Sequence, residues 1–214
     1  MRRGLFITFE GLDFSGKTTQ AARLADHLRS LGADVTAVRE PGGTPVGERV
    51  REILADKSLV IGAKTESFLF AAARCQLMTD VMLPALSRGG IVVADRFLDS
   101  SLAYQGYAGG VDTDIVAELN FIATDWMEPD ITFLLDVPVN VMFARRPGGY
   151  RADRIESRGV EFFEKARRGY IELTKRFKNR IAIVDGCAPE ERVFSEVLRS
   201  IEPRLALYIK EEKK

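Results

Sequence analysis

The segment GLDFSGKTT, residues 11–19, is the feature that most limits what this chain can fold into. Four of its positions match the pattern G-x-x-x-x-G-K-[ST]: Gly11, Gly16, Lys17 and Thr18. In this pattern the glycines let successive backbone N–H groups turn inward toward a phosphate, and a helix beginning near Lys17 directs its positive dipole end at the same anion. The Lys17 ammonium can reach the β- and γ-phosphates of a nucleotide, and the Thr18 hydroxyl can ligate Mg²⁺.

Elements of the right type flank this loop. An apolar run of strand length, Leu5–Phe9, precedes it, and Gln20–Leu31 follows with apolar residues at helical spacing. A chance match in a glycine-containing turn rarely has this order of strand, loop and helix. We therefore expect the loop to bind ATP through nine consecutive residues: Gly11, Leu12, Asp13, Phe14, Ser15, Gly16, Lys17, Thr18 and Thr19.

Strand and helix signals alternate along the whole chain. Helical patterns separate five short apolar runs, at residues 5–9, 35–38, 91–94, 131–136 and 181–184. Such alternation predicts an α/β fold with three layers, in which helices cover both faces of a five-stranded parallel sheet, as in P-loop NTP hydrolases and nucleotide kinases. Because no linker or internal repeat is visible, we expect a single domain over residues 1–214.

Prolines and glycines lead to specific expectations for three helices. Residues 65–87 are helical in pattern, and Pro84 should kink or end that helix. A short helical piece, Ser100–Gln105, should give way to a loop at residues 106–110. The last helix, from Pro189 to about residue 209, should bend or break at Pro203.

Composition and charge argue against several classes of protein. The 31 basic and 31 acidic side chains cancel, so a general affinity for nucleic acid polymers is not expected. Two cysteines make no disulfide framework, which favours a reduced, cytoplasmic protein. The first apolar run is too short for a signal peptide, and no run approaches the length of a membrane span.

Functional groups are expected at the carboxyl edge of the sheet, where several loops leave the strands. Asp95 and Arg96 follow the third apolar run. The aspartate can orient Mg²⁺ or its water shell, as a Walker B aspartate does, and the arginine can fork onto a phosphate. A structural ion pair at the end of a strand is the alternative.

Two groups of side chains suit a planar base. Phe70 and Arg74 share a helix face and can offer a stacking ring and a hydrogen bond to an exocyclic oxygen, although a phenylalanine in an apolar helix is more often core. Ser101, Tyr104 and Gln105 share a face of the next helical piece. Gln105 can match a pyrimidine edge and Tyr104 can crowd a 2′-hydroxyl; ordinary surface polarity is the alternative.

Five arginines fall within fourteen residues in a segment that contains glycines. If it closes over a transferring phosphoryl group, its positive charge would stabilise the developing negative charge; a solvated basic face is the alternative. We expect a lid at about residues 146–158. The arginines are Arg145, Arg146, Arg151, Arg154 and Arg158.

Taken together, these motifs resemble those of bacterial thymidylate kinases, which belong to the P-loop nucleoside monophosphate kinases. The resemblance runs in consistent order from residue 4 to about residue 200. It implies transfer of the γ-phosphoryl group of ATP to dTMP, with Mg²⁺, in dTTP biosynthesis, by a homodimer packed through helices. The matching stretches are EGLD (10–13), GKTTQ (16–20), REPGGT (39–44), Phe70 with Arg74, DRF (95–97), AYQG (103–106) and DRIE (153–156).

The resemblance also implies a role for each residue of the acceptor site. Phe70 would stack on thymine, Arg74 would meet its carbonyl oxygen, and Gln105 its N3 edge with Ser101 nearby. Tyr104 would disfavour ribose. Asp13 would hold the 3′-hydroxyl of the deoxyribose. The dTMP phosphate would be surrounded by Arg39, Arg51 and Arg96, while Glu40 and Asp95 would help to place Mg²⁺ and water.

By the same resemblance, Lys17, Arg96 and Asp13 would act at the transferred phosphoryl group together with Arg154 and either Arg151 or Arg146 of the lid. Arg145 and the loop around Cys187 would hold the adenine. Phe14 stands where relatives carry a small residue or a catalytic arginine, so the lid must supply that arginine.

Two other functions stay open at this point. One is another nucleotide or deoxynucleoside kinase of the same fold with a different acceptor. The other is a P-loop ATPase switch that has no acceptor at all. A GTPase switch would need an N-K-x-D guanine reader, and the sequence contains no such tetrapeptide.

Overall fold

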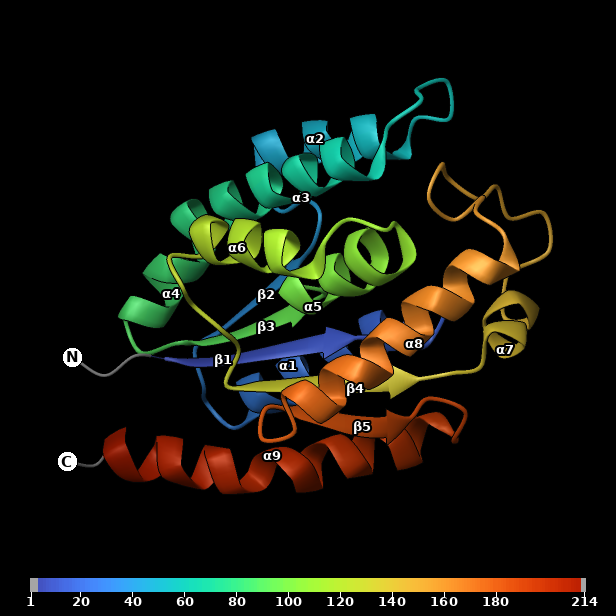
Figure 1. Cartoon of the computed structure of the whole chain (residues 1–214). Helices are drawn as coiled ribbons and strands as arrows, with labels where there is room; N and C mark the ends of the chain where they lie inside the picture. Colours follow the sequence, from blue (N-terminus) through green and yellow to red (C-terminus); the bar gives the residue numbers. More distant parts are fainter. Residues whose placement is uncertain (1–3, 213–214) are drawn as a thin grey trace.

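The computed structural model of the chain describes residues 4–212, and one parallel sheet lies at its centre (Figure 1). The five strands are β1 (Leu5–Glu10), β2 (Val35–Arg39), β3 (Ile91–Asp95), β4 (Ile131–Asp136) and β5 (Ile181–Asp185). They pair in the order β2-β3-β1-β4-β5, with every pair parallel. The predicted α/β fold with five parallel strands is confirmed.

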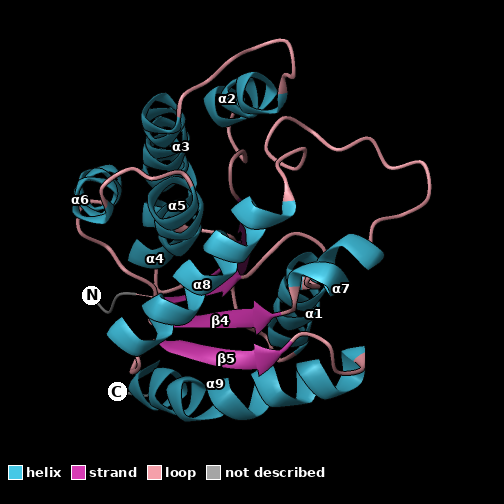
Figure 2. Cartoon of the chain, turned by 45° about the vertical axis from the view of Figure 1, so that its right-hand side comes forward, coloured by secondary structure: helices cyan, strands magenta, loops and turns pink. Residues whose placement is uncertain are grey.

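Helices cover both faces of this sheet (Figures 1 and 2). Leu24 of α1 and Val197 of α9 are fully buried in one apolar cluster with Ile7 and Val93 of the strands, which places both helices on one face. Burying each such side chain contributes about 1.5–3 kcal/mol, so these contacts hold this helix layer on the sheet. The helices are α1 (Lys17–Ser30), α2 (Pro45–Ala55), α3 (Ala63–Leu77), α4 (Leu83–Ser87), α5 (Leu98–Ser101), α6 (Thr113–Ala123), α7 (Val139–Ala144), α8 (Val160–Arg176) and α9 (Glu190–Glu212).

The helix that contains Pro84 continues through this proline, so of the two predicted outcomes, a kink or a helix end, the end is wrong. A π-helical turn, Met78–Met82, joins α3 to α4, and the N–H of Leu83 bonds to the carbonyl of Met78. This wider turn accommodates a proline that lacks an N–H and whose ring would clash in a regular α-helix.

The combined helix Ala63–Ser87 is, by length and composition alone, long and apolar enough to cross a membrane, and it is the one such helix among the described residues. The sequence-based expectation that no run approaches this length was therefore too strict. Inside it, Glu66 and Arg74 are buried and bonded to residues of other elements. Buried polar contacts of this kind are typical of a core helix, because a lipid-facing helix would leave such groups without partners.

Two further helix predictions need correction. The segment expected to be a loop from Gly106 continues as a π-helical stretch, Leu102–Ala108, directly after α5. Helix α9 runs through Pro203 without interruption, so of the two predicted outcomes, a bend or a break, the break is wrong. Pro203 lies on the exposed side of α9, where water can bond to the carbonyl that a proline leaves unpaired.

Candidate active site

The loop between β1 and α1 has the conformation that its glycines predict. Gly11 and Gly16 have φ values of 137° and 97°. A Cβ on Gly11 would lie 2.4 Å from the carbonyl oxygen of Leu135, so a side chain does not fit there. The Lys17 ammonium folds across the loop and donates to the carbonyl oxygen of Leu12 at 2.6 Å. Its charge therefore lies where an inward-facing phosphate would be held.

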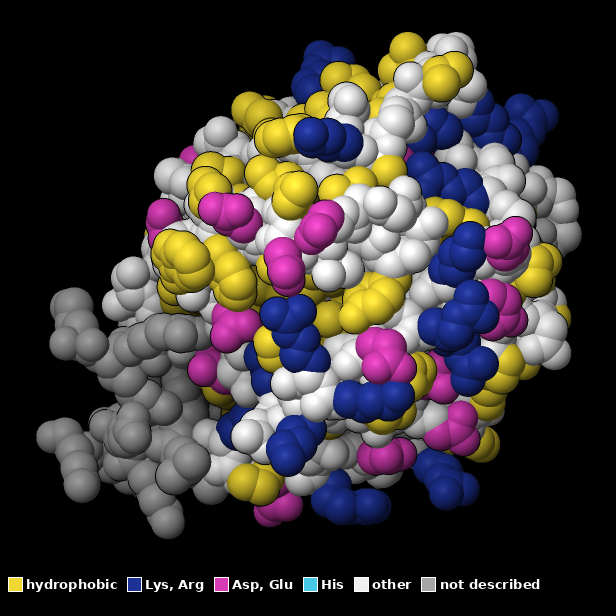
Figure 3. Space-filling model, viewed as in Figure 1, with side chains coloured by type: hydrophobic (Ala, Val, Ile, Leu, Met, Phe, Trp, Pro, Cys, Tyr) yellow, Lys and Arg dark blue, Asp and Glu magenta, His cyan; other side chains and the backbone are white. Residues whose placement is uncertain are grey.

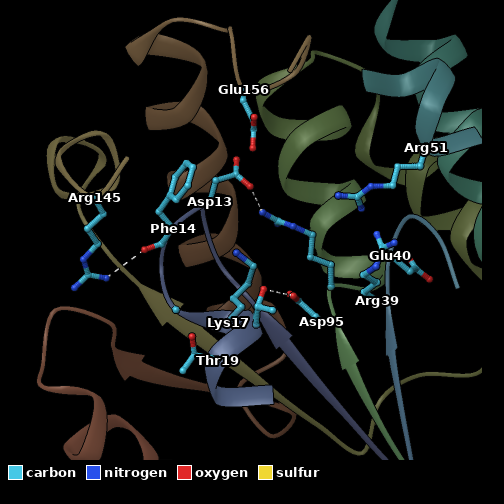
Figure 4. A pocket seen from close by; sticks show the side chains of 13 residues that line it. Asp13, Phe14, Lys17, Thr19, Arg39, Glu40, Arg51, Asp95, Arg145 and Glu156 are labelled. Atoms are coloured by element: carbon cyan, nitrogen blue, oxygen red, sulfur yellow. Dashed lines mark hydrogen bonds and ion pairs between the residues drawn. The ribbon is translucent and has the colours of Figure 1, made fainter. Parts of the chain in front are cut away.

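At the mouth of this loop, a hydroxyl and a carboxylate lie together. Thr18 at the start of α1 donates from Oγ1 to Oδ2 of Asp95 at the end of β3, over 2.5 Å (Figure 4). Oxygen ligands of this kind suit Mg²⁺, which takes one or two protein ligands and completes its shell with phosphates and water. In line with such a sparse set, the side chains that the structure describes include no group of three or more His, Cys, Asp or Glu that could hold a metal.

A cavity of about 650 Å³, here called the phosphate-loop cavity, opens above this loop (Figure 4). Arginines from β2, α2 and the ends of β3 and α7 face the loop across it. Its lining is Asp13, Phe14, Gly16, Lys17, Thr18, Thr19, Arg39, Glu40, Arg51, Asp95, Arg96, Arg145 and Glu156.

A second cavity of about 360 Å³, here called the Phe70 cavity, adjoins the first. Five of the residues predicted to contact the acceptor base and sugar line it: Asp13, Phe70, Ser101, Tyr104 and Gln105. The rest of its lining is Glu40, Pro41, Arg51, Leu54, Ala55, Arg96, Ser100, Tyr150, Arg151, Asp153, Ile155 and Glu156. The two cavities share Asp13, Glu40, Arg51, Arg96 and Glu156.

Arg96 stands at this junction in a conformation that few non-glycine residues adopt. Its φ is 72°, which costs on the order of 1–3 kcal/mol unless the surroundings impose it. Its Nη2 donates to Asp13 at 2.5 Å, and its Nη1 donates to Gly11, Ser100 and Tyr170. These contacts from three parts of the chain fix one guanidinium between the two cavities.

Comparison with known proteins agrees with this two-cavity geometry. The family model for thymidylate kinase matches residues 9–197. The chain belongs to the thymidylate kinase family.

Curated relatives support this assignment over almost the whole chain. The thymidylate kinase of Caldanaerobacter subterraneus is 46% identical over 95% of this chain and 97% of its own. That of Desulforudis audaxviator is 48% identical over 85% of this chain and 83% of its own. The crystal structure of thymidylate kinase from Ehrlichia chaffeensis has a TM-score of 0.77 at 33% identity, covering 93% and 99% of the two chains. The resemblance seen in the sequence, and the class of kinase that it implied, are thereby confirmed.

Within this thymidylate kinase family member, burial and neighbouring charges change the pKa of three groups at the phosphate loop. Burial, together with the positive charge of the nearby Arg96, lowers the pKa of Lys17 to about 8, although acidic neighbours oppose the change. Burial alone would raise the pKa of Asp13, but the positive charges of Arg96 and Lys17 bring it below the usual value. Burial raises the pKa of Glu10 to about 7. The loop thus carries a lysine that loses charge just above neutral pH.

Tyr104 connects the two cavities through Asp13. Its hydroxyl donates to Oδ2 of Asp13 at 3.2 Å, and the Arg96 guanidinium lies 5.2 Å from the centre of its ring. Burial, together with the negative charge of Asp13, raises the pKa of Tyr104, so the hydroxyl stays protonated and remains a donor. Asp13 is therefore held by Arg96 on one oxygen and by Tyr104 on the other.

Arg74 does not line either cavity, although the sequence placed it at the base. It is 1% exposed and forms a buried ion pair with Glu40 over 2.6 Å. The same guanidinium donates to the carbonyl of Phe97, to Ser101 and to Asn120. Arg74 thus supports the wall that Glu40 and Ser101 form.

The two lid arginines that were predicted to be catalytic lie in different places. Arg151 lines the Phe70 cavity. Arg154 lines neither cavity, because it donates to the carbonyl of Leu54 and to Glu66. The loop between α7 and α8 thereby comes to lie against the end of α2 (Figure 2).

Directly after α7, Arg145, which was predicted to hold the adenine, bridges two loops. It donates to the carbonyl oxygen of Phe14 at 3.3 Å and to that of Gly186 at 2.8 Å (Figure 4). Cys187 follows directly, with an exposed side chain and an N–H that bonds to Asp185. The Phe14 ring meets that of Tyr150, in the loop between α7 and α8, edge to face at 5.1 Å between centres.

Sequence reasoning assigned no role to several residues that hold the site together. Glu10 accepts from Ser100 and Tyr170, which also hold Arg96, and Glu66 accepts from Gln105. The sequence signal that could have found them is a polar residue within or next to an apolar strand or helix, such as Glu10 directly after the apolar run 5–9.

Proposed function

We propose that this protein transfers the γ-phosphoryl group of ATP to dTMP in a Mg²⁺-dependent reaction, with ATP in the phosphate-loop cavity and dTMP in the Phe70 cavity. The observation that carries this assignment is that the two cavities meet at Asp13, Arg51 and Arg96. Two polyanions bound there would be brought phosphate to phosphate beside fixed positive charge. Phosphoryl transfer needs little more than such positioning and charge stabilisation.

On the donor side, the amides of the loop and the Lys17 ammonium would hold the β- and γ-phosphates. Arg145 and the backbone around Cys187 would hold the adenine, in keeping with the contacts of Arg145 to Phe14 and Gly186. Thr18 and Asp95 would hold Mg²⁺, directly or through water. When bound, this ion would neutralise charge on the transferring phosphoryl group.

On the acceptor side, Phe70 would stack on thymine while Gln105 and Ser101 contact its edge. Arg74, which was predicted to meet a carbonyl oxygen of the base, would instead act through Ser101 and Glu40, to which it donates from behind the cavity wall. Tyr104 would exclude a 2′-hydroxyl beside the sugar that Asp13 holds.

Charge on the acceptor phosphate would be met by arginines from three elements. Arg39, Arg51 and Arg96 line the phosphate-loop cavity, and Arg51 and Arg96 also line the Phe70 cavity. Glu40, which lines both cavities, would help to orient water around the Mg²⁺ site.

The chain would act as a single kinase domain in which residues 146–158 are the lid. Arg151 is the better placed of the two predicted lid arginines, because it lines the Phe70 cavity whereas Arg154 is engaged by Glu66. We assign to Arg151 the role of stabilising the transferred phosphoryl group.

The protein would work as a homodimer in the cytoplasm, without binding nucleic acid polymers or membranes. Apolar side chains gather over α2, α3 and α6 (Figure 3). Trp126 is 71% exposed and stacks on Phe121, while Phe68 and Ile122 are 53% and 64% exposed. Exposed patches of this kind mark interaction surfaces. Light scattering should give twice the chain mass, and Trp126→Asp should shift the protein toward monomer.

A coupled ADP-release assay tests the function directly. With ATP and Mg²⁺ present, dTMP should be the preferred acceptor among dTMP, dUMP, UMP, CMP and thymidine. Preference for another acceptor would favour a different kinase of this fold. ADP release that dTMP leaves unchanged would instead favour a P-loop ATPase switch.

A further inference from the structure

Glu66 on α3 is a completely buried carboxylate that binds three partners from two other parts of the chain. Its Oε1 accepts from Nε2 of Gln105 at 2.8 Å. Its Oε2 accepts from Arg154 at 2.6 Å and from Arg158 at 2.8 Å. Glu66 therefore joins the helical segment that carries Gln105 to the loop between α7 and α8.

The bond to Glu66 determines which end of the Gln105 amide faces the Phe70 cavity. A glutamine amide offers an NH₂ donor at one end and a carbonyl acceptor at the other. An ionised carboxylate only accepts, so the NH₂ group must point at Glu66. Gln105 lines the cavity, and none of the described residues donates to its Oε1. The cavity is thus presented with an acceptor.

An acceptor at this place selects among pyrimidines. Thymine and uracil carry an N–H at N3, which can donate to a carbonyl oxygen, whereas N3 of cytosine is itself an acceptor. When a ligand leaves a buried polar group of the site without a hydrogen-bond partner, the site rejects that ligand strongly. We propose that Glu66 is a positioning residue that makes the enzyme choose an N3–H base, by fixing the orientation of the Gln105 amide.

This inference rests on the proposed function only in that Gln105 must face the acceptor base. It adds a physical link between base recognition and the loop that carries Arg151, and the proposed function does not require this link. Because the same carboxylate holds Arg154 and Arg158, the group that reads the base and the loop that carries Arg151 share one anchor. Glu66, Phe70 and Arg74 are spaced four residues apart, so one face of α3 carries all three.

Glu66→Gln tests the inference, because the new amide can donate as well as accept. In this variant the NH₂ group of the new amide can bond to Oε1 of Gln105, which lets the Gln105 NH₂ turn toward the cavity and match the N3 acceptor of cytosine. The measured quantity is the ratio of kcat/KM for dTMP to that for dCMP, from ADP release. We expect the wild-type enzyme to favour dTMP and Glu66→Gln to lower this ratio about tenfold or more, the factor that pairing one buried polar group, instead of leaving it unpaired, confers.

Arg158→Met is the matched control. It removes one guanidinium from Glu66 but leaves the carboxylate to orient Gln105, so kcat should change for both substrates while the ratio stays at the wild-type value. An unchanged ratio in a folded Glu66→Gln protein would overturn the inference. A wild-type enzyme without preference for dTMP over dCMP would instead overturn the base pocket of the proposed function, and the role of Glu66 with it.

A second variant covers the case in which Glu66→Gln does not fold. The triple variant Glu66→Leu, Arg154→Met, Arg158→Met removes all three buried charges together, and such replacements are often neutral or stabilising. Its ratio should also fall, because nothing fixes the Gln105 amide. A wild-type ratio in this folded triple variant would contradict the inference.

Discussion

Glu10 is the buried acid from which the clearest pH dependence follows. Its carboxyl group has no solvent exposure, and it accepts from the N–H groups of Phe97 and Ser100 and from the hydroxyls of Ser100 and Tyr170. Burial raises its pKa from 4.5 to about 7; the charge of Asp99 adds to this, and Arg96 opposes it. Folding therefore favours the protonated form of Glu10.

The sign and size of the effect on stability follow by linkage. Below pH 4.5 both the folded and the unfolded chain hold this proton. Between pH 4.5 and about 7 the unfolded chain releases the proton while the folded chain keeps it, so stability is lost as the pH rises through that range. One pKa unit corresponds to about 1.4 kcal/mol, so the complete loss is about 3 kcal/mol.

Glu10→Gln removes this titration and keeps the shape of the side chain. The amide carbonyl can accept from the two N–H groups, and the two hydroxyls can turn to accept from the amide NH₂. The free energy of unfolding of variant and wild type, from urea denaturation, should diverge in favour of the variant by about 2–3 kcal/mol from about pH 5 to about pH 8. Glu52→Gln, on the exposed face of α2, should parallel the wild type. Parallel curves for Glu10→Gln as well would refute the reasoning.

Three further changes test other parts of the site. Burial lowers the pKa of Lys17 to about 8, so its charge is lost above that pH and kcat/KM for ATP should fall above about pH 8. The variant Lys17→Ala should lose turnover by orders of magnitude while its circular dichroism spectrum stays that of the wild type. Arg74→Leu leaves the carboxylate of Glu40 buried without its partner and should lower the free energy of unfolding in urea by about 3–5 kcal/mol; a loss below about 1 kcal/mol would show that this pair is unimportant. Phe14→Gly relieves a left-handed φ of 57° at the expense of the ring contact with Tyr150. These effects are each about 1 kcal/mol, so stability should stay nearly constant in thermal unfolding while KM for ATP rises.

The parts of this protein that were predictable from its sequence are those encoded locally. Each strand is a short run of apolar residues, and the phosphate loop needs Gly11 and Gly16 at one spacing, so both are visible in a window of ten residues. Residues that line the cavities from neighbouring positions, such as Ser101, Tyr104 and Gln105, were also within reach because they share one helical segment.

The positions of Arg74 and Arg154 could not be predicted in this way, because their partners are distant in sequence. Arg74 pairs with Glu40, 34 residues away, and Arg154 pairs with Glu66, 88 residues away. The spacing of Phe70 and Arg74 correctly indicated a shared helix face, but it contained no information about which acidic side chain would take up the guanidinium. Pro84 misled for a related reason: whether a proline ends a helix depends on whether the preceding turn can widen.

Arg96 shows why these distant contacts matter for catalysis. A positive charge aimed at a transferring phosphoryl group is most effective when it needs no rearrangement at the moment of reaction. Its left-handed backbone and its bonds to Asp13 on the loop, to Ser100 on α5 and to Tyr170 on α8 leave little freedom for the guanidinium. Helix α8, which carries Tyr170, directly follows the loop that carries Arg151. Tyr170→Phe removes the hydroxyl to which Arg96 donates, so it should disturb the placement of Arg96 without touching either nucleotide. It should therefore lower kcat more than it raises KM for dTMP or ATP, and equal changes in kcat and KM would argue against a positioning role.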